Sequence, residues 1–397
     1  MEKKEKLKQG IYGVYLNLKT RNRKTSGIFD YSCDSRNKNK NFFIRKYTYL
    51  IKDENNDIKE YEYLENISEK DIIIFLIRTR KNKFYIDNVT LMKKHNLEHN
   101  KENIKMLNNF IWKVINSDSL DIKNPNEDYY LQQNDIIKFG NVKYIVSEIH
   151  FNNNKKDNKI NNNEIISLIP KCLEYKKCDY CHKDIYRLCK CNEFHHYDCI
   201  NKYIEDNMRF FQNKKKTVTN YVFRIIECKE IIKKDTSSDG IESKNYEDIK
   251  CNTYYSLKFK LSDNSIIDCY PIDKPLNKDC LILESLEFEN VEYNNRIEKN
   301  IHIIELNGEE INIGREKYND VIIDDSSVSI EHAVIRYDKI NKKLLLKNKS
   351  KEAGTLVLYR EPKIEMKEKE IYLQVDNTFI EAKLMKEEEY LKTKDNK

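Results

Sequence analysis

The spacing of its cysteines restricts what this 397-residue chain can fold into more than any other feature. Six of the eleven cysteines lie between Cys172 and Cys199. Three close pairs of potential metal ligands stand in this stretch: Cys178 and Cys181, Cys189 and Cys191, His196 and Cys199. A tight turn places ligands that are two residues apart on the same side of the chain, where thiolate and imidazole can share a tetrahedral zinc ion. The spacing predicts a small zinc-stabilised module with Zn²⁺ as cofactor, one ion or two.

Clustered cysteines indicate metal binding rather than disulfides when the compartment is reducing. No stretch approaches the roughly 18 consecutive apolar residues that cross a membrane, and the lysine-rich N-terminus lacks the apolar region of a secretion signal. The 72 basic and 66 acidic side chains are spread along the chain, so no concentrated basic surface indicates a nucleic-acid partner. We expect a soluble intracellular protein, in the cytoplasm or nucleus, with no membrane span and no nucleic-acid partner.

Outside the cysteine cluster the composition favours strands. Isoleucine, tyrosine and valine are abundant, while the chain has 8 glycines and 5 prolines. The Asn/Lys-rich stretch 151–170 has almost nothing to bury and is interpreted as a linker, and 233–250 as an exposed loop. These tracts delimit a β-rich domain at 1–150, a zinc domain at 171–251 and a β-sandwich with a C-terminal tail at 252–397. The predicted fold class is mainly β, with a small zinc-stabilised α+β module.

The order C-x2-C, C-x-C, H-x2-C resembles the RING-CH type of RING zinc finger. The resemblance implies a first zinc ion held by Cys178, Cys181, His196 and Cys199, and a second site that includes Cys189, Cys191 and Cys228. The family has a helix after H-x2-C, and apolar residues recur at helical spacing here: Ile200, Tyr203, Ile204, Met208 and Phe211. Domains of this family recruit a ubiquitin-conjugating enzyme and have no catalytic nucleophile of their own.

The second zinc site departs from the family at its last ligand. The family ends in C-x2-C, but Ile231 stands where Cys228 should have its partner. Four residues could replace the missing ligand: Cys172, His182, His195 and Cys251. His195 also competes with His196 in the first site, where the H-x2-C spacing favours His196. Both a structural zinc knot and a complete two-zinc module therefore remain open, and a site short of one ligand would be more labile.

A second ordered set of motifs lies nearer the C-terminus. It consists of Gly314-Arg315, Asn319-Asp320, Ser329-Ile330-Glu331-His332 and Gly354-Thr355. In this order the motifs resemble the forkhead-associated (FHA) domain, a phosphopeptide-binding β-sandwich, over about residues 281–385. The resemblance implies that Arg315 and Ser329 reach the phosphate of a phosphothreonine. It also implies that Gly314, His332 and Gly354 shape the loops of the site.

Two positions depart from the FHA pattern. Ala353 replaces an asparagine that holds the peptide backbone, and Glu352 replaces a Thr or Ser aimed at the phosphate, which a carboxylate repels. A phosphate-independent docking surface is the rival interpretation. Residues 130–140 also resemble the closing strands of an FHA sandwich, but no Gly-Arg or Ser-x-x-His pair precedes them. For 1–150 we expect a plain β-domain, with a degenerate FHA-like domain as the alternative.

Two functions fit these motifs. The first is a zinc-binding adaptor that docks a phosphorylated protein partner through its FHA-like domain. The second is a RING-CH-type ubiquitin-protein ligase whose FHA-like domain selects phosphorylated substrates, with a ubiquitin-conjugating enzyme as its other partner. Only the second would be an enzyme, since the sequence contains no catalytic Ser/His/Asp set and no phosphate-cradling glycine loop.

Overall fold

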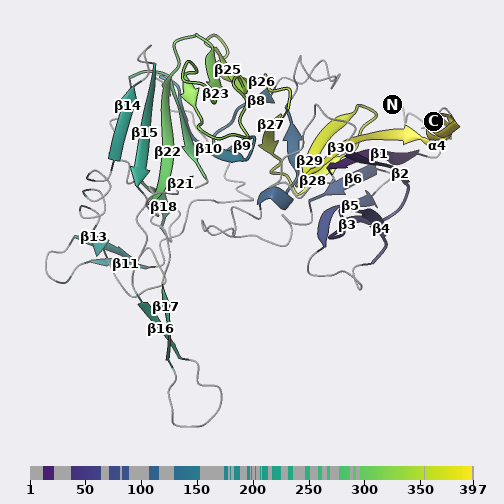
Figure 1. Cartoon of the computed structure of the whole chain (residues 1–397), viewed down its shortest axis with the longest axis horizontal. Helices are drawn as coiled ribbons and strands as arrows, with labels where there is room; N and C mark the ends of the chain where they lie inside the picture. The colour runs from purple at the N-terminus through teal and green to yellow at the C-terminus, as the bar shows by residue number, and fades with distance from the viewer. Residues whose placement is uncertain are drawn as a thin grey trace, which may run out of the picture. The chain divides into compact units, whose positions relative to one another are not determined.

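The computed structural model forms two compact units (Figure 1). It describes residues 12–21, 37–63, 71–80, 83–88, 107–115, 129–152, 174–177, 179, 183–187, 195–196, 198, 202, 206, 208–212, 217–224, 231–235, 246–250, 258–261, 266–268, 277–286, 289–291, 296–352 and 354–395. The first unit combines 1–95, 106–146 and 307–397, and the second combines 96–105 with 147–306. This grouping differs from the linear boundaries expected from the sequence, because strands from the two ends of the chain pair with each other.

One part of the first unit, here called the N-terminal sandwich, contains two sheets. The five-stranded sheet has the order β4 (Ile58–Tyr61), β3 (Thr48–Lys52), β5 (Ile72–Arg80), β6 (Lys83–Asp87), β28 (Lys363–Glu365). The opposing strands are β29 (Ile371–Val375), β30 (Thr378–Lys386), β1 (Tyr12–Arg21) and β2 (Asn37–Ile44). Alternate residues of β1, such as Leu16, pack with Leu50, Phe75 and Ile380 in one core, as expected for strands with one buried face.

The other part of the first unit, here called the C-terminal sandwich, has a second five-stranded sheet. Its order is β24 (Val321–Ile322), β23 (Ile311–Gly314), β25 (Ala333–Asp338), β26 (Lys343–Asn348), β8 (Tyr129–Tyr130). Its other strands are β10 (Val142–His150), β9 (Ile136–Phe139), β27 (Thr355–Leu358) and β7 (Trp112–Val114). Phe139, Tyr144 and Ile335 are all fully buried in it.

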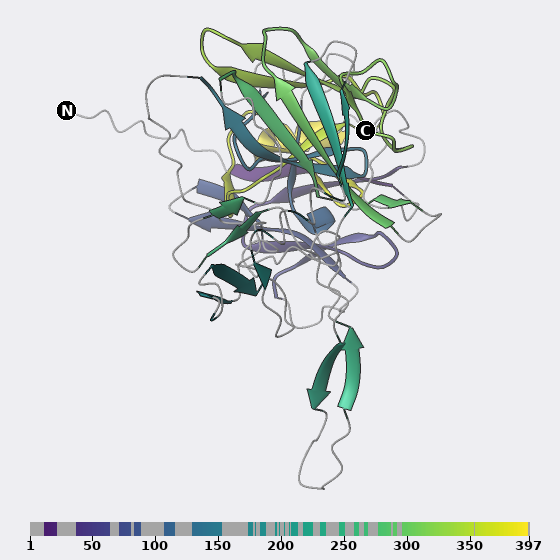
Figure 2. The ribbon, with the colours of Figure 1, turned by 90° about the vertical axis from the view of Figure 1, so that its left-hand side faces the viewer.

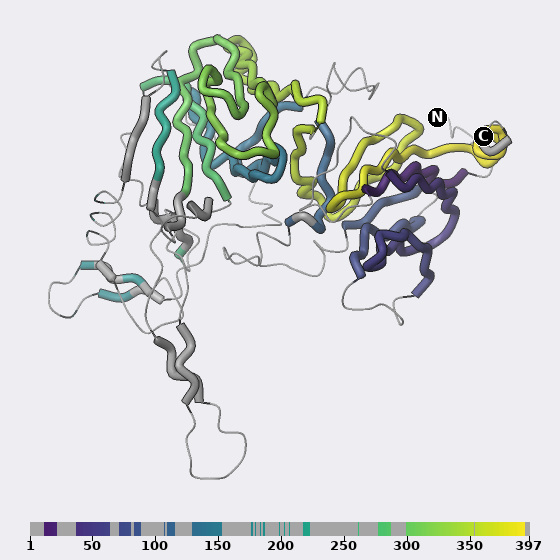
Figure 3. Tube along the Cα trace, viewed as in Figure 1, coloured from purple at the N-terminus to yellow at the C-terminus, as the bar shows by residue number. Residues whose placement is uncertain are grey.

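The two sandwiches exchange their closing strands. Both five-stranded sheets run second, first, third and fourth strand, followed by a strand from the other end of the chain: β28 in one and β8 in the other. A hairpin follows each of these strands, β29–β30 or β9–β10, and its turn begins with a positive φ, 50° at Asp376 and 59° at Gly140. The tube in Figure 3 shows the C-terminal strands lying beside the N-terminal ones. Each sandwich is therefore completed by the distant half of the sequence.

The strands β7 and β27 connect the two sandwiches. They pair antiparallel, with Val114 opposite Leu356. On their outer sides β27 pairs with β9 and β7 pairs with β29. One continuous sheet thus runs through both sandwiches. Residues 130–140, which resemble the closing strands of an FHA sandwich, contribute to the closing strands of the C-terminal sandwich.

The second unit is also built from strands. Its larger sheet contains β14 (Met208–Gln212), β15 (Val218–Arg224), β22 (Arg296–Glu305), β20 (Cys280–Ser285) and β21 (Glu289–Val291). Smaller sheets are β11 (Glu174–Lys177), β12 (Asp184–Arg187) and β13 (His195–His196); β16 (Ile231–Asp235) and β17 (Tyr246–Lys250); and β18 (Lys258–Lys260) and β19 (Ile266–Asp268). The ribbon β16–β17 (Figure 2) occupies both ends of the tract 233–250, so its described ends are paired strands rather than the expected loop.

The mainly β fold class is confirmed for the described residues. The helix α4 (Glu387–Asp395) follows β30, and its Tyr390 stacks on Phe43 of β2 with ring centroids 4.7 Å apart. A short 3-10 helix, η2 (Leu107–Asn109), precedes β7. In the part of the chain that the structure describes, no helix is long and apolar enough to cross a membrane.

Candidate phosphopeptide site

The first element of the candidate site is the end of strand β23. Gly314 is the last residue of that strand, and a Cβ atom there would lie 2.1 Å from the carbonyl oxygen of Ile330. Only glycine therefore allows the two loops to approach so closely. The next residue, Arg315, donates its backbone N–H to the carbonyl of Ser329 at 3.0 Å, and its guanidinium lies 3.4 Å from the carbonyl oxygen of Ser326. Arg315 and Ser329 are thus on neighbouring loops.

The hydroxyl of Ser329 has a buried partner that the sequence analysis did not single out. Its Oγ lies 2.6 Å from the Oγ of Ser350, whose side chain is 1 % exposed. Ser350 also accepts the backbone N–H of Glu352 at 3.3 Å. A serine a few residues before Gly354 was a visible signal, but only the fold shows that it meets Ser329.

His332 connects the loop of Ser329 with the loop of Gly354. It is fully buried, accepts the N–H of Ser329 on Nδ1 at 3.1 Å and donates from Nε2 to the carbonyl of Gly354 at 3.0 Å. Burial lowers the pKa of His332 to about 4, so the imidazole is neutral at physiological pH. A neutral imidazole with one donor and one acceptor nitrogen suits both hydrogen bonds.

Asn319 is a second buried brace that was not expected from the sequence as a site residue. Its amide is 3 % exposed and donates to the carbonyls of Glu316 at 2.9 Å and Ile330 at 2.8 Å. Asp320 beside it accepts the N–H of Asn312 at 2.9 Å. Asn319 thus holds the loop that follows Arg315 against the loop that carries Ser329, and Asp320 holds the same loop against β23.

The loop of Ser329 also rests on the β9–β10 hairpin. The N–H of Asn141 donates to Ser327 Oγ at 2.8 Å, and Gly140 approaches so closely that a Cβ would lie 2.4 Å from the Ser327 carbonyl oxygen. The ring of Phe139 meets His332 edge to face at 5.6 Å. The candidate site therefore depends on strands from residues 136–146, far away in the sequence.

Charged side chains of both signs surround this site. Lys317, Glu331, Lys351 and Glu352 are all exposed, while Arg315 is partly buried. Ala353, the position that departs from the family asparagine, lies outside the described residues. Glu352 places an exposed carboxylate on the loop of Ser350, so the site combines attractive and repulsive charges for an anion.

The predicted zinc ligands fall almost entirely outside the described residues. This applies to Cys178, Cys181, Cys189, Cys191, Cys199 and Cys228. The backbone of His196 lies in β13, opposite Ile185 of β12. Residues 198, 202 and 206 are helical, as expected after H-x2-C. Met208 and Phe211 belong to strand β14, so the expected helix is wrong at these two positions. Among the described residues, no group of three or more His, Cys, Asp or Glu side chains could hold a metal ion.

Comparison with known families now assigns part of the chain. Residues 311–387 match the FHA domain family. This range begins at β23, includes every motif residue from Gly314 to Gly354 and ends one residue into α4. The chain therefore contains an FHA domain, as its motifs indicated. No curated protein and no solved structure matches the chain.

The matched range has a structural consequence. It includes β28, β29 and β30, which complete the N-terminal sandwich rather than the sandwich that carries Arg315. In a sandwich formed by contiguous sequence, these strands would close the domain that precedes them. Here the segment 129–146 takes that place.

Proposed function

We propose that the C-terminal sandwich binds a phosphothreonine peptide of a protein partner through Arg315 and Ser329. The observation that carries the proposal is the pairing of Ser329 with the buried Ser350 beside the loop of Arg315. A guanidinium forms charge-assisted hydrogen bonds with phosphate oxygens. The neighbouring hydroxyl adds a neutral donor, and recognition by an arginine and a few donors is a common way of reading phosphorylated motifs.

The Ser350 hydroxyl sets the role of Ser329 in this proposal. Ser350 accepts the N–H of Glu352, and in this proposal it donates its own hydroxyl hydrogen to Ser329. Ser329 then keeps its hydrogen for the phosphate. Ser350 would act by orienting Ser329, without contacting the ligand.

The test is phosphopeptide binding by fluorescence polarisation. A labelled phosphothreonine peptide library is titrated with the full chain, followed by the unphosphorylated and phosphoserine forms of the best peptide. Arg315→Ala should weaken binding at least about tenfold, because it removes the charge-assisted bonds, whereas the nearby exposed Lys317→Ala should change it little. Phosphopeptide affinity that Arg315→Ala leaves unchanged, with the fold intact by circular dichroism, would overturn the assignment.

A second function is proposed for the middle of the chain, from ligand spacing alone. We propose that Cys178, Cys181, His196 and Cys199 bind one Zn²⁺ ion, and that Cys189, Cys191 and Cys228 contribute to a second. With one ion the protein would be an FHA-type adaptor that contains a structural zinc knot. With two ions it would be a candidate RING-CH ubiquitin ligase that selects phosphorylated substrates.

Zinc stoichiometry separates these two possibilities. Elemental mass spectrometry after mild chelation should give one or two firmly held ions, and Cys178→Ser should lower the zinc content and destabilise the module. Unchanged zinc in that variant would contradict the ligand assignment. Autoubiquitination with purified conjugating enzymes then tests the ligase, since an adaptor forms no chains.

A further inference from the structure

Two large hydrophobic side chains are exposed on the loops of the candidate phosphopeptide site. Tyr318, on the loop that follows Arg315, is 64 % exposed, and Ile330, the residue after Ser329, is 49 % exposed. A single exposed hydrophobic residue is ordinary on a protein surface. Two of them on adjoining loops of one candidate site indicate a surface that contacts the ligand.

The two side chains belong to one surface because their loops are held together. The buried amide of Asn319, which follows Tyr318, donates to the carbonyl of Ile330 at 2.8 Å. Desolvation raises the pKa of the Tyr318 hydroxyl, and the nearby carboxylates of Glu331 and Glu316 raise it further. Tyr318 therefore lies near the residue that follows Ile330.

Hydrogen bonds fix the loops that carry this pair. The N–H of Ser329 donates to His332 Nδ1 at 3.1 Å, which holds the backbone beside Ile330. The N–H of Asn319 donates to the carbonyl of Glu316 at 3.1 Å, which closes the turn that contains Tyr318. A surface that is fixed in advance loses little conformational entropy when a ligand binds.

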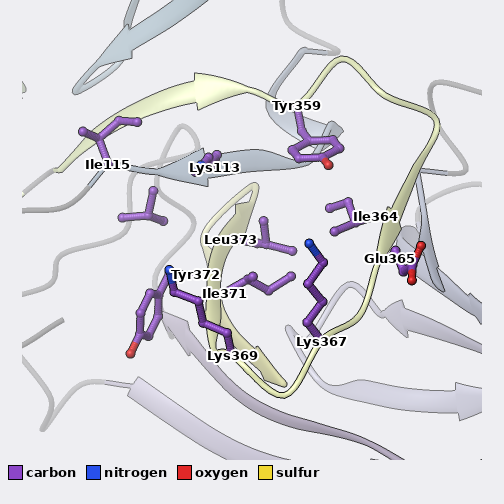
Figure 4. A pocket seen from close by; sticks show the side chains of 11 residues that line it. Lys113, Ile115, Tyr359, Ile364, Glu365, Lys367, Lys369, Ile371, Tyr372 and Leu373 are labelled. Atoms are coloured by element: carbon purple, nitrogen blue, oxygen red, sulfur yellow. The ribbon is translucent and has the colours of Figure 1, made fainter. Parts of the chain in front are cut away.

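A cavity of about 200 Å³ offers apolar surface in another place. Residues of β7, β28 and β29 line it, and Figure 4 shows Tyr359, Ile364 and Leu373 around it. No residue of the candidate phosphopeptide site lines this cavity. Ile330, by contrast, is the direct neighbour of Ser329, so the exposed pair is continuous with the proposed phosphate-binding residues.

We propose that Tyr318 and Ile330 select phosphothreonine peptides that carry a bulky apolar residue within three positions of the phosphothreonine. The inference rests on the proposed binding of the phosphate by Arg315 and Ser329. An extended peptide advances about 3.3 Å per residue, so three residues reach about 10 Å from the phosphothreonine. Burying about half of a leucine side chain against the exposed pair should raise affinity roughly tenfold.

The experiment measures fluorescence polarisation with the full chain and a set of labelled phosphothreonine peptides. The reference peptide has alanine at the three positions on each side of the phosphothreonine, and six further peptides place leucine at each of these positions in turn. At one position or more, leucine should strengthen binding roughly tenfold over the reference peptide. Unphosphorylated forms of all seven peptides show which part of the binding depends on the phosphate.

Variants of the chain assign the leucine preference to the exposed pair. Ile330→Ser and Tyr318→Ser should each reduce the ratio of the leucine to the alanine affinity severalfold, and the double variant should bring this ratio to about one. The matched control is Ile340→Ser, because Ile340 is 92 % exposed in the turn between β25 and β26. This control should leave the roughly tenfold ratio unchanged. Circular dichroism checks that each variant is folded.

Three results would overturn the inference. They are the absence of any position where leucine raises affinity, a leucine preference that survives in the double variant, and equal effects of Ile330→Ser and Ile340→Ser. In each case, phosphate-dependent binding that Arg315→Ala weakens would still support the proposed function. If no peptide binds in a phosphate-dependent manner, the proposed function is wrong and this inference is overturned with it.

Discussion

The two sandwiches of the first unit share a strand order but differ at the connection that carries the candidate phosphopeptide site. In the C-terminal sandwich β23 and β24 pair in parallel, so a wide loop carrying Arg315 must connect them. In the N-terminal sandwich β3 and β4 pair antiparallel through a tight turn, in which Asn56 donates to the carbonyl of Asp53 at 3.0 Å. The same strand order thus carries the loop of Arg315 in the C-terminal sandwich and a closed hairpin turn in the N-terminal sandwich.

The last residue of the first strand shows the same contrast. Gly314 ends β23 and lets the site loops approach, whereas Lys52 ends β3 and its side chain is 3 % exposed. Lys52 forms an ion pair with Asp376, and its ammonium also donates a hydrogen bond of 2.7 Å to Asn377 Oδ1. The Lys52 ammonium is buried and held by the closing hairpin, so it is not presented to a ligand. The difference shows that the sandwich alone does not make a phosphate site.

Removal of the closing strands should have the largest effect on the difference between the two sandwiches. A chain that ends after residue 362 lacks β28, β29 and β30, so β1 loses its pairing with β30 from Tyr12 to Thr20. We expect the N-terminal sandwich to unfold while the C-terminal sandwich keeps its closing hairpin 136–146. Hydrogen exchange should rise throughout 12–20 and 48–52 and stay slow in 333–338.

The opposite pattern of hydrogen exchange would show that β28–β30 close the C-terminal sandwich instead.

A cross-link provides the control, because Asn17 and Glu381 face each other on β1 and β30 and their side chains form a hydrogen bond of 3.1 Å. Cysteines at both positions should form an intrachain disulfide that mass spectrometry identifies. A pair at Asn17 and Lys339 should form none.

The sequence predicted the motif residues of the candidate site, but not the distant strands that hold their loops in place. Arg315, Ser329 and His332 stand in short motifs that can be read locally, and the structure places them on adjoining loops. The exchange could not be predicted, because both hairpins consist of largely buried strands joined by a turn that begins with a positive φ, so local pattern cannot tell which sandwich each one joins. The contact of Ser327 with Asn141 depends on this non-local choice. The zinc ligands stay a prediction.

We expect the second largest difference in how the free energy of unfolding of each sandwich depends on pH. His332 has a pKa lowered from 6.5 to about 4 by burial, so below pH 6.5 the unfolded chain binds a proton that the folded chain refuses. The contribution of the neutral His332 to the free energy of unfolding is fully present at pH 7. It is lost as the pH falls from 6.5 toward 4, by about 3 kcal/mol in all. The described residues of the N-terminal sandwich contain no histidine, so this histidine contribution is absent from them.

Urea unfolding at pH 7 and pH 5 measures this effect. His332→Gln should lose stability at pH 7 but show a smaller difference between the two pH values. His302, buried in the second unit with its pKa also lowered to about 4, provides the matched variant. An equal pH dependence in wild type and His332→Gln, with His302→Gln removing it, would move the acid sensitivity to the second unit.

The contacts that hold the two closing turns should differ in strength. Lys52→Met removes a buried cation from Asp376, whose side chain is 19 % exposed, and we expect a loss of about 2 kcal/mol. Ser327→Ala removes the hydrogen bond that its hydroxyl accepts from Asn141 in the equivalent turn of the other sandwich, together with the one it donates to the partly exposed Asp325, and should cost about 1 kcal/mol. Thermal unfolding of both variants at pH 7 gives the comparison. A larger loss for Ser327→Ala would contradict the importance of the ion pair.

The smallest expected effects concern the phosphopeptide loop itself. Glu352→Thr removes an exposed carboxylate beside Ser350, so phosphopeptide affinity should rise severalfold, with a weaker gain at high salt because screening already reduces the repulsion. Ser350→Ala should lower affinity severalfold by freeing the Ser329 hydroxyl, without changing its salt dependence. Fluorescence polarisation across a salt series measures both. If Glu352→Thr changes nothing at low salt, Glu352 lies too far from the bound phosphate to repel it.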